Sequence, residues 1–495
     1  MEHDADVVVV GAGNAALCAA IAASNKGARV IVAEAAPEAE MGGNTAYTAG
    51  AMRFAFNGVE DIQSLVPDLT DQEIENSDFG TYTEDQFFDD MFRVTQFRTD
   101  PVMVETLVRK SLSSLQWMKA QGVRFQTSHG RQAFKVDGKF KFWGGLACEV
   151  WGGGPGLVEM LVASASKKGV RILFETSVTE LIHEDGKVAG VRIMREGKPG
   201  ALTAKSVVLA CGGFESNAEM RTRYLGPNWD LAKVRGTRFN MGAGHKMAMK
   251  IGAMPYGHWS GAHAVSWEQN APPFGDLAVG DAFQKHSYPF GIMINARGER
   301  FVDEGADFRN YTYAKYGSQV LAQPGLFAWQ VFDGKVLGLL RDEYRIRQVT
   351  KVSADTLEEL AEKLEGVDAG AFLKTVAEFN DAVDTGAPFN PNIKDGRAAL
   401  GLRVPKSNWA NRIDEGPFEA YAVTCGVTFT FGGLKIDEAA QVENTDGKPI
   451  PGLFAAGEIV GGLFYHNYPG GSGLTAGSVF GKIAGETAAE SAGFK

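Results

Sequence analysis

The chain has 495 residues, which at about 150 residues per domain excludes a single small binding module and allows a large buried core. Hydrophobic residues make up 44% and charged residues 22%, so wholesale disorder is excluded, and a net charge of −11 argues against general affinity for DNA or anionic membranes. Glycine is the abnormal count, with 61 residues against an average near ~7%. No G-X-Y period accompanies it, so collagen is excluded and we expect the excess in turns where the backbone approaches something closely.

The four cysteines lie far apart with no CxxC pair, so no metal site, iron–sulfur cluster or disulfide framework is expected. No Lys or Arg precedes the first apolar run, so the N-terminus lacks the basic start of a signal peptide. Residues 7–23 form the most apolar window, but Gly11, Gly13 and Asn14 interrupt it, which favours strand–turn–helix over a membrane span. We expect a cytoplasmic protein, with peripheral membrane contact only through an electron acceptor.

The first predicted unit is a βαβ dinucleotide-binding motif. Four valines at 7–10 predict a strand buried on both faces, a G-x-G-x-x-A turn follows, and a helix runs to Gly27. A second strand over 28–33 ends at Glu34, whose carboxylate is expected to accept hydrogen bonds from ribose hydroxyls. The helix N-terminus would face the pyrophosphate. The predicted cofactor contacts of this motif are Gly11, Gly13, Asn14, Ala15 and Glu34.

Further along, residues 50–160 mix helical patterns with glycine-rich loops, and strands return over 171–175, in a hairpin through Asp185-Gly186 and over 207–210. Residues 260–410 change character and include a helix over 357–364 that Ser353 or Asp355 would start. Short glycine-rich strands resume at about 415. The pattern predicts an α/β fold, α+β overall. A Rossmann-like dinucleotide-binding domain over 1–259 and 413–495 would be interrupted by an inserted domain over 260–412.

The fingerprint alone does not separate NAD from FAD, but the C-terminal tail favours FAD. LFAAGE at 453–458 predicts a strand ending in Gly457 and Glu458, with Glu458 on a ribityl hydroxyl. A helix beginning near Gly473-Leu474-Thr475 would point its amides at isoalloxazine O2 and N1, where negative charge gathers on reduction. A flat ring could lie against a third strip, Gly42-Gly43-Asn44-Thr45. The remaining cofactor candidates are Val178 and Gly212.

Beyond these glycine strips, the motifs RFVDE at 300–304, GGL at 432–434 and AGE at 456–458 resemble the fumarate reductase/succinate dehydrogenase flavoprotein superfamily, over essentially the whole chain. Within it, the sequence is most similar to the FAD-dependent tricarballylate dehydrogenases. The stretches that carry this likeness are GAGHK at 242–246, YGHWSGAH at 256–263, FQKHSYPF at 283–290, FRNYTY at 308–313 and FYHNYPGG at 464–471.

The resemblance implies that the Rossmann-like domain over 1–259 and 413–495 is an FAD-binding domain, and that the inserted domain over 260–412 is a capping, substrate-binding domain that closes over the flavin. Complex-type members bind FAD covalently through a histidine where this chain has Asn44; an amide nitrogen is not nucleophilic, so non-covalent FAD is expected. Arg309 matches the arginine that delivers or takes the proton, allowing one extra residue in the loop. His263 matches a histidine that binds a substrate carboxylate.

Two departures argue against fumarate or succinate as substrate. Phe429 or Thr428 stands where the fumarate-type histidine precedes Gly-Gly, and Tyr468 stands where the fumarate-type arginine precedes the last Gly-Gly. The fumarate clamp for the second carboxylate is therefore missing.

The catalytic candidates are Arg309, Tyr468 and His263. Each has a purely structural alternative: Arg309 as a surface ion pair with Asp303 or Asp307, His263 as a packed core histidine, and Tyr468 as a ring that packs on the flavin rather than a donor or base. An arginine acts as acid or base only where its surroundings make its proton mobile, since its ordinary pKa exceeds ~12. The substrate-binding candidates are His258, Tyr256, His286, Phe429, Thr430 and His466.

These observations predict an FAD-dependent dehydrogenase that takes a hydride and a proton from adjacent carbons beside a carboxylate or carbonyl. The resemblance implies tricarballylate oxidised to cis-aconitate. Three alternatives stay open: a fumarate-reductase-type ene-reductase, a ketosteroid-type dehydrogenase, which the tyrosine-rich stretches allow, and a flavin electron-relay subunit. Without an iron–sulfur or haem-attachment motif, electrons are expected to leave to a separate acceptor, in the family a membrane electron-transfer protein. No nucleic-acid partner is expected.

Overall fold

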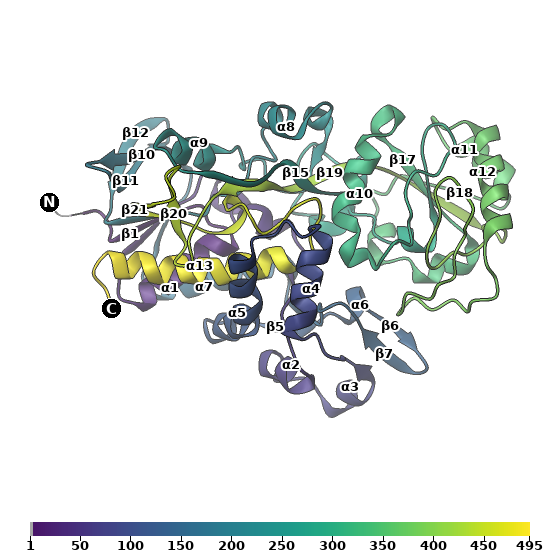
Figure 1. Ribbon diagram of the computed structural model, residues 1–495, viewed down its shortest axis with the longest axis horizontal. Helices are drawn as coiled ribbons and strands as arrows, with labels where there is room; N and C mark the ends of the chain where they lie inside the picture. Colours follow the sequence, from purple (N-terminus) through teal and green to yellow (C-terminus); the bar gives the residue numbers. More distant parts are fainter. Residues whose placement is uncertain (1–2) are drawn as a thin grey trace. The chain divides into compact units, whose positions relative to one another are not determined.

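The computed structural model describes residues 3–495, and the chain divides into two compact units (Figure 1). The first unit contains residues up to 230, 236–262 and 429–495; the second contains 231–235 and 263–428. Met1 and Glu2, where the expectation about a signal peptide begins, lie outside the described residues. The functional domain boundaries at 260 and 412 stay a prediction, and two long strands, β15 (Pro255–Glu268) and β19 (Phe418–Leu434), run across the unit boundaries.

The first unit is built on a six-stranded sheet in the order β20-β21-β13-β1-β2-β9. Strand β1 pairs in parallel with β2 and β13 on its two sides. Every residue of β1 is buried, as expected for a strand covered on both faces. This confirms the predicted βαβ unit. The strands are β1 (Val7–Val10), β2 (Val30–Ala33), β9 (Arg171–Leu173), β13 (Ser206–Leu209), β20 (Gln441–Glu443) and β21 (Pro449–Ala455).

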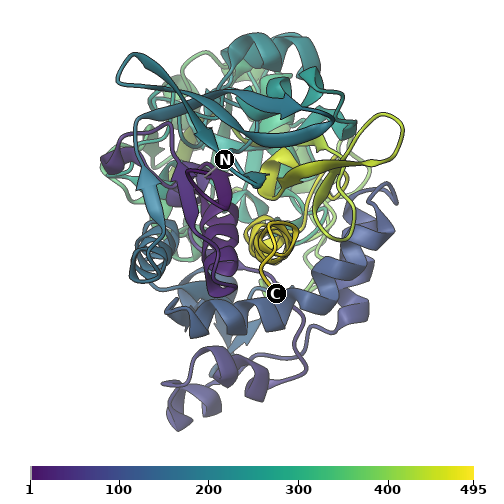
Figure 2. The same ribbon diagram turned by 90° about the vertical axis from the view of Figure 1, so that its left-hand side faces the viewer.

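Helices α1 (Asn14–Asn25) and α13 (Ser472–Ser491), from opposite ends of the chain, pack side by side (Figure 2). Glycines on α13 make this close contact possible. A Cβ at Gly481 would lie 2.5 Å from Ala15 O, and one at Gly485 would lie 2.1 Å from Ala19 O. The approach brings the start of α13 to the βαβ turn.

The rest of the first unit is made of helices and three small sheets. The predicted hairpin at Asp185-Gly186 is confirmed, since it joins β10 to β11. The helices are α2 (Val59–Leu65), α3 (Asp71–Glu75), α4 (Glu84–Val94), α5 (Pro101–Ala120), α6 (His129–Gln132), α7 (Gly153–Lys167), α8 (Ala218–Leu225) and α9 (Ala243–Lys250). The strands are β3 (Ala51–Met52), β4 (Ser77–Asp78), β5 (Phe125–Thr127), β6 (Ala133–Val136), β7 (Lys139–Phe142), β8 (Cys148–Val150), β10 (Thr176–Glu184), β11 (Lys187–Arg195) and β12 (Lys198–Thr203).

The second unit has its own mixed sheet, in the order β14-β19-β17-β16, with β15 and β18 also paired to β19. Its elements are β14 (Lys233–Val234), β16 (Ile292–Ile294), β17 (Ala328–Phe332), β18 (Lys351–Ala354), α10 (Tyr313–Leu321), α11 (Leu357–Lys363) and α12 (Ala369–Ala382). The core between sheet and helices includes Ile292, Val331, Leu360 and Phe372.

The predicted helix near 357–364 is present, but its start was placed wrongly. Thr356, rather than Ser353 or Asp355, caps α11, because its Oγ1 accepts from Glu359 N at 3.2 Å. Ser353 belongs to β18 and pairs with Glu419. Both capping candidates lie too early in the chain, because Ser353 is still in the strand and Asp355 precedes the residue whose side chain accepts from the helix.

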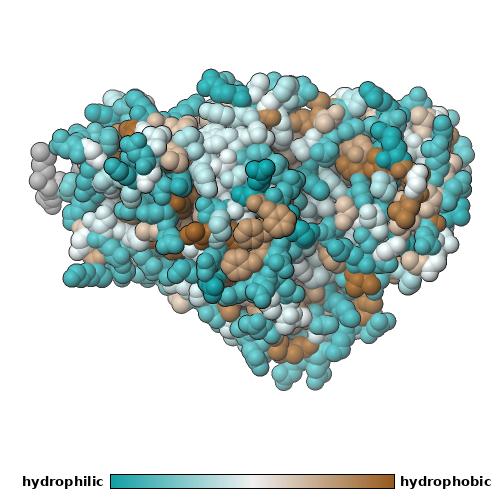
Figure 3. All heavy atoms as spheres, viewed as in Figure 1, coloured by the Kyte–Doolittle hydropathy of each residue, from teal (hydrophilic) through white to brown (hydrophobic). Residues whose placement is uncertain are grey.

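Hydrophilic residues predominate on the face drawn in Figure 3, with apolar ones scattered among them. From residue 3 to the C-terminus, the helices include none whose length and hydropathy would let it cross a membrane.

Candidate active site

The β1–α1 turn requires glycine because of its backbone conformation and its close approach to a neighbouring segment. Gly11 has φ +100°, in the left-handed region, and a Cβ there would lie 2.5 Å from Ala210 O. Gly13 is extended and precedes α1, where a Cβ would lie 3.4 Å from Gly42 O. The turn therefore presents bare backbone beside the helix N-terminus, the arrangement that suits a pyrophosphate.

Glu34 lies at the end of β2 with only 6% of its surface exposed. Its carboxylate accepts from Ala12 N at 2.6 Å and from Ala36 N at 2.8 Å. Burial raises the pKa of this carboxyl. Glu34 thus fastens the end of β2 to the glycine turn, and its contact with ribose hydroxyls stays a prediction.

The strip at 42–45 folds as a 3₁₀-helix, η2 (Gly43–Tyr47), which begins after Gly42 at φ +101°. A Cβ on Gly42 would lie 2.7 Å from Val158 Cγ2 in α7. Thr45 Oγ1 accepts from Asn14 N at 3.0 Å, so the strip is tied to the first turn of α1. The two glycine segments, 30 residues apart in sequence, form one continuous backbone surface.

Both polar atoms of the Asn44 side chain are hydrogen-bonded within the protein. Its Nδ2 donates to Glu215 Oε1 at 2.7 Å and its Oδ1 accepts from Thr237 N at 2.9 Å. Asn240 Nδ2 donates to the same Glu215 oxygen at 2.5 Å. Burial raises the pKa of Glu215. The sequence analysis did not predict Glu215 or Asn240 as site residues. Glu215 could have been found from its position directly after the glycine-rich strand end Cys211-Gly212-Gly213-Phe214.

Glu458 lies in η10 (Gly457–Ile459) at the end of β21. Its Oε1 accepts from Thr430 N at 2.9 Å, so Thr430, a predicted substrate contact, bonds to this carboxyl. Burial, and then the neighbouring Glu215 carboxyl, raise the pKa of Glu458. A Cβ on Gly213 would meet Glu458 Oε1 at 2.0 Å, so the strand end at 212–213 and the AGE segment are in close contact.

The start of α13 meets the same region. Gly471, at φ +83°, precedes the helix, and its N–H donates to Tyr468 Oη at 3.0 Å. Asn14 Nδ2 donates to Leu474 O at 2.8 Å, and Thr475 is fully buried. The N-termini of α1 and α13 therefore lie in one region with the strip at 42–45. Two helix N-termini beside turns that exclude a Cβ fit a long, anionic, planar cofactor such as FAD.

The other predicted cofactor contacts fall in the same unit. Ala15 is in α1, Gly457 has φ +80° with a Cβ position 2.8 Å from Ala15 Cβ, and Gly212 has φ +71°. Gly473 is in α13, where a Cβ would be 3.5 Å from Tyr468 Cε2. Val178 is buried in β10. These residues stay predicted cofactor contacts.

An aromatic cluster stands next to Gly473 in the first unit. We define it as Phe429, Phe431, Phe464 and Tyr468. Phe429 and Phe464 both meet Tyr468 nearly edge to face, with ring centroids 5.3 and 5.2 Å apart and interplanar angles of 87° and 89°. Phe429 meets Phe431 at 5.4 Å. Phe429, or Thr428 next to it, and Tyr468 stay the predicted replacements of the fumarate-type histidine and arginine.

His258 lies beside the aromatic cluster and is held by backbone. Its Nδ1 accepts from His466 N at 3.0 Å, and its ring stacks on Tyr465 at 5.8 Å and 9°. Burial, and then His466, lower the pKa of His258 to about 4, so the ring is neutral. Tyr256 Oη donates to Asp100 Oδ2 at 3.0 Å, and burial together with that carboxylate raises the pKa of Tyr256 to about 12. His258 and His466 are brought together; Tyr256 is tied to Asp100.

In the second unit, His263 and His286 meet the same ring. His263 lies 5.0 Å from Tyr313 at 81°, and His286 lies 4.8 Å from it at 66°. Both histidines are 1% exposed. Burial, and then the positive charge of Arg235, hold the pKa of His263 well below its ordinary value, so its imidazole is neutral. Tyr313 was not among the predicted site residues, although it lies within the FRNYTY stretch.

Arg235 is neutralised within the second unit. Its Nε and Nη2 reach Asp281 Oδ1 at 2.9 and 2.5 Å, and its Nη1 donates to Thr428 Oγ1 at 3.2 Å. The buried pair leaves this arginine engaged by a carboxylate. Its positive charge acts on His263, while the adjoining Asp281 carboxylate balances the charge of the buried pair.

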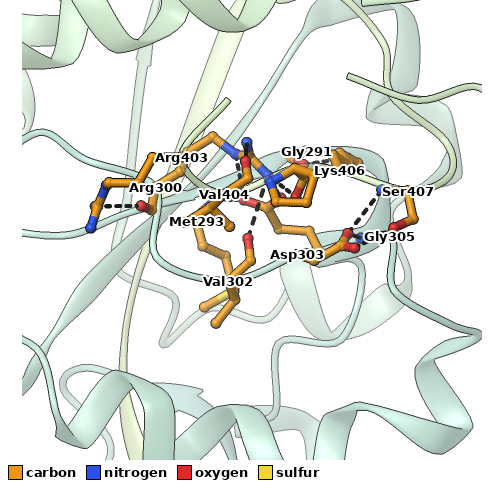
Figure 4. Close-up of polar contacts among 12 residues, drawn as sticks. Gly291, Met293, Arg300, Val302, Asp303, Gly305, Arg403, Val404, Lys406 and Ser407 are labelled. Carbon is orange, nitrogen blue, oxygen red and sulfur yellow. Dashed lines mark hydrogen bonds and ion pairs between the residues drawn. The ribbon is translucent and has the colours of Figure 1, made fainter. Parts of the chain in front are cut away.

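The RFVDE motif, which precedes Arg309 in the sequence, is hydrogen-bonded to other chain segments (Figure 4). Arg300 pairs with Glu304, whose Oε1 also accepts from Met293 N at 2.8 Å, and Arg300 Nη1 donates to Val404 O at 2.7 Å. Asp303 Oδ1 accepts from Ser407 N at 3.0 Å. The motif thus ties three chain segments together. The charged side chains of Arg300, Asp303 and Glu304 all bond to other groups of the protein.

Lys406 lies next to Ser407, which bonds to the RFVDE motif. Its Nζ donates to Gly291 O at 2.6 Å, and burial lowers the pKa of Lys406 to about 8 (Figure 4).

Arg309 begins η6 (Arg309–Tyr311), directly before α10, and is half-buried. Its positive charge opposes the rise that burial causes in the pKa of Tyr288, so the two side chains are electrostatic neighbours. Tyr288 Oη and Thr312 Oγ1 share a hydrogen bond of 2.7 Å. Arg309 is therefore carried by a short, anchored segment four residues before Tyr313.

Residues 6–474 match the protein family described as FAD binding domain. The chain is 31% identical to fumarate reductase (cytochrome) of Shewanella frigidimarina over 494 residues, covering 99% of this chain and 78% of that protein. It is 30% identical to NADH:fumarate oxidoreductase of Klebsiella pneumoniae (strain 342), covering 98% of this chain and about half of that relative's length, 48%. The solved open conformation of a flavocytochrome c3 fumarate reductase resembles it with a TM-score of 0.72 at 27% identity, over 99% of this chain and 78% of that one.

Proposed function

Because the chain belongs to the FAD binding domain family, with FAD as its cofactor, we propose that it is a dehydrogenase of saturated C–C bonds beside a carboxylate or carbonyl. Tricarballylate, oxidised to cis-aconitate, is the proposed substrate. Bound FAD supplies a two-electron hydride acceptor. The chain's own residues must then bind the carboxylates, polarise one of them and accept the α-proton.

The observation that carries the proposal is the pair of buried imidazoles on Tyr313. A neutral imidazole has one N–H that can donate to a carboxylate, and burial strengthens such a bond. His263 is neutral, and His286 shares its ring partner at similar distance. We assign carboxylate binding to these two histidines, since a donor to the carboxylate also stabilises enolate character as the α-proton leaves.

We assign the proton transfer to Arg309. A half-buried guanidinium on an anchored loop has the fixed position that general acid–base catalysis needs. Tyr468 is the alternative base: its oxygen accepts from Gly471 N–H at the start of α13, where a helix terminus favours negative charge on that oxygen. Arg309→Ala and Tyr468→Phe separate the two assignments, because only the true base is needed for fast flavin reduction.

The aromatic cluster favours a second candidate, a neutral cyclic ketone or enone. Two of its rings, Tyr468 and Phe429, lie within 3.5 and 3.9 Å of a Cβ placed on Gly473, and the two edge-to-face contacts with Tyr468 form an apolar wall. Such a wall suits a planar uncharged substrate of the ketosteroid type better than a tricarboxylate. The same chemistry run backwards gives an ene-reductase.

The experiment that decides is anaerobic mixing of the purified flavoprotein with tricarballylate, succinate and a 3-ketosteroid, each followed by flavin absorbance. Bleaching by tricarballylate supports the first candidate, and bleaching by the steroid alone supports the second. Reoxidation of chemically reduced flavin by an activated alkene alone supports the ene-reductase. No reaction in either direction would leave a flavin electron-relay subunit.

We further propose a separate electron acceptor, a membrane electron-transfer protein by the family resemblance, and a cytoplasmic location. The test for the acceptor is reoxidation of substrate-reduced enzyme by membranes and by soluble dyes under argon. Reoxidation by dyes but not by membranes would contradict the membrane acceptor.

A further inference from the structure

The segment that carries His286 has no regular secondary structure. It runs over 284–287, between the 3₁₀-helices η4 (Gly280–Phe283) and η5 (Tyr288–Phe290). A side chain on such a segment holds its orientation only if the flanking backbone is fixed from outside. His286 is nevertheless buried, with its ring at a defined 66° to Tyr313.

Two side chains close a hydrogen-bonded ring around this segment. Gln330 Nε2 donates to Lys285 O at 3.0 Å, on one side of His286. Tyr344 Oη accepts from Ser287 N at 2.8 Å, on the other side, and donates to Gln330 Oε1 at 2.5 Å. Both peptide groups next to His286 are thus joined through two side chains from distant parts of the unit.

The direction of every bond in the ring is determined. Lys285 O can only accept, so the amide nitrogen of Gln330 must face it. Ser287 N–H can only donate, so the Tyr344 oxygen must accept from it and send its own proton to Gln330 Oε1. A ring with one permitted arrangement holds its members in one geometry.

The members of the ring are deeply buried and packed. Gln330 is 0% and Tyr344 2% exposed. The Tyr344 ring is wedged edge-on against Tyr421 at 4.8 Å and 87° and against Phe332 at 5.5 Å and 90°. Gln330 is the one polar residue in β17, whose sequence is AWQVF and whose five positions are all buried. An apolar residue would be cheaper to bury there, so the amide is expected to have a use beyond stability.

Lys285 fixes the same segment from a third direction. Its N–H donates to Ser266 O in β15 at 3.0 Å. Its fully buried ammonium lies 3.3 Å from the carbonyl oxygens of Ala282, Phe283 and Gln284 and 3.9 Å from Glu268 Oε2. The two peptide groups that flank the Lys285 Cα are therefore both hydrogen-bonded, through its N–H to Ser266 O and through its C=O to Gln330 Nε2.

We infer that Gln330 and Tyr344 are positioning residues that hold His286 against Tyr313. This inference rests on the proposed function in so far as His286 binds a substrate carboxylate. Neither residue is expected to touch the substrate. They act through the backbone on either side of the imidazole.

The test is Tyr344→Phe, which deletes one hydroxyl and keeps the ring. Loss of one buried neutral hydrogen bond is expected to lower kcat/KM about tenfold, chiefly through KM. In a His286→Gln background the same substitution should change kcat/KM by less than about twofold, while its effect on the unfolding midpoint persists in both backgrounds. An equal kinetic loss in both backgrounds would show a merely structural role and overturn the inference.

Tyr421→Phe is the matched control, because it also removes one tyrosine hydroxyl. That hydroxyl bonds to Glu419 and takes no part in the hydrogen bonds that join Gln330, Tyr344 and the 284–287 segment. The substitution should leave kcat/KM within about twofold of wild type. If Tyr344→Phe fails to fold, Gln330→Met breaks the same ring and is measured in the same way.

A second readout does not depend on any substrate. The chain has 8 histidines, so histidine-labelled holoenzyme gives few imidazole NMR signals, and His286→Gln assigns the one sought. Tyr344→Phe should shift that signal and Tyr421→Phe should not. An unmoved signal would overturn the inference even with active enzyme, and a moved signal with no turnover on any substrate would support it while the proposed function fails.

Discussion

Gly11→Ala tests whether the β1–α1 turn is a cofactor cradle. Gly11 has φ +100° and a Cβ position 2.5 Å from Ala210 O, a backbone atom that cannot swing aside. Gly27 is the matched control, because it has a similar φ of +93° but its Cβ position has nothing nearer than Phe494 Cδ1 at 3.8 Å. Comparing the two alanine variants separates the cost of the left-handed backbone from the cost of the close approach.

Both substitutions carry the left-handed strain of a non-glycine residue, about 1–2 kcal/mol. Only Gly11→Ala adds overpacking against backbone, about 1–3 kcal/mol, which is relieved by moving the turn away from β13. Because that movement displaces the amides that would face the pyrophosphate, it should appear in FAD affinity. The expected weakening is about tenfold to a hundredfold for Gly11→Ala relative to Gly27→Ala.

The assay is titration of deflavinated protein with FAD, followed by quenching of flavin fluorescence, with thermal unfolding of the apoprotein measured in parallel. Gly27→Ala should lose stability and keep its FAD affinity. Equal FAD affinities for the two variants would refute the cradle.

Proton transfer, cofactor attachment and the pH dependence of stability can each be tested separately. Arg309→Ala should retain FAD and lower the rate of anaerobic flavin reduction about 10²- to 10⁴-fold, measured by stopped flow; an unchanged rate would remove Arg309 from proton transfer. Acid precipitation should release all flavin into the supernatant, because the Asn44 amide is not a nucleophile, and a yellow pellet would contradict this. Burial lowers the pKa of Lys406 to about 8 from 10.5, so between these pH values the unfolded chain binds the proton more tightly and unfolding free energy rises with pH. Lys406→Met should lose about 3 kcal/mol of that rise in parallel denaturant titrations, and identical slopes for the two proteins would contradict it.

The βαβ unit was predictable because its signals are local. A run of four valines, a glycine turn and a carboxylate at the next strand end occur within about 30 residues, and each has a meaning that does not depend on the rest of the chain. The reason that Gly11 must be glycine is different. It depends on Ala210, about 200 residues away, and appears only when β13 is placed beside β1.

The second unit shows what local patterns do not contain. His263 and His286 were candidates separately, but that they share Tyr313 depends on the packing of β15, the 284–287 segment and α10. Arg300 was recognised as part of a motif, whereas its bond to Val404 joins segments 104 residues apart. The cap of α11 is Thr356 rather than Ser353 or Asp355, because strand pairing with β19 includes Ser353 and Ala354 and the helix begins only at Leu357.

Anaerobic addition of tricarballylate to the purified flavoprotein, with the oxidised-flavin absorbance recorded, shows directly whether this protein oxidises a C–C bond. We expect complete bleaching and one equivalent of cis-aconitate per flavin. An unbleached flavin, with no reaction of its reduced form with activated alkenes or of its oxidised form with other carboxylates or ketones, would contradict C–C oxidoreduction by this protein.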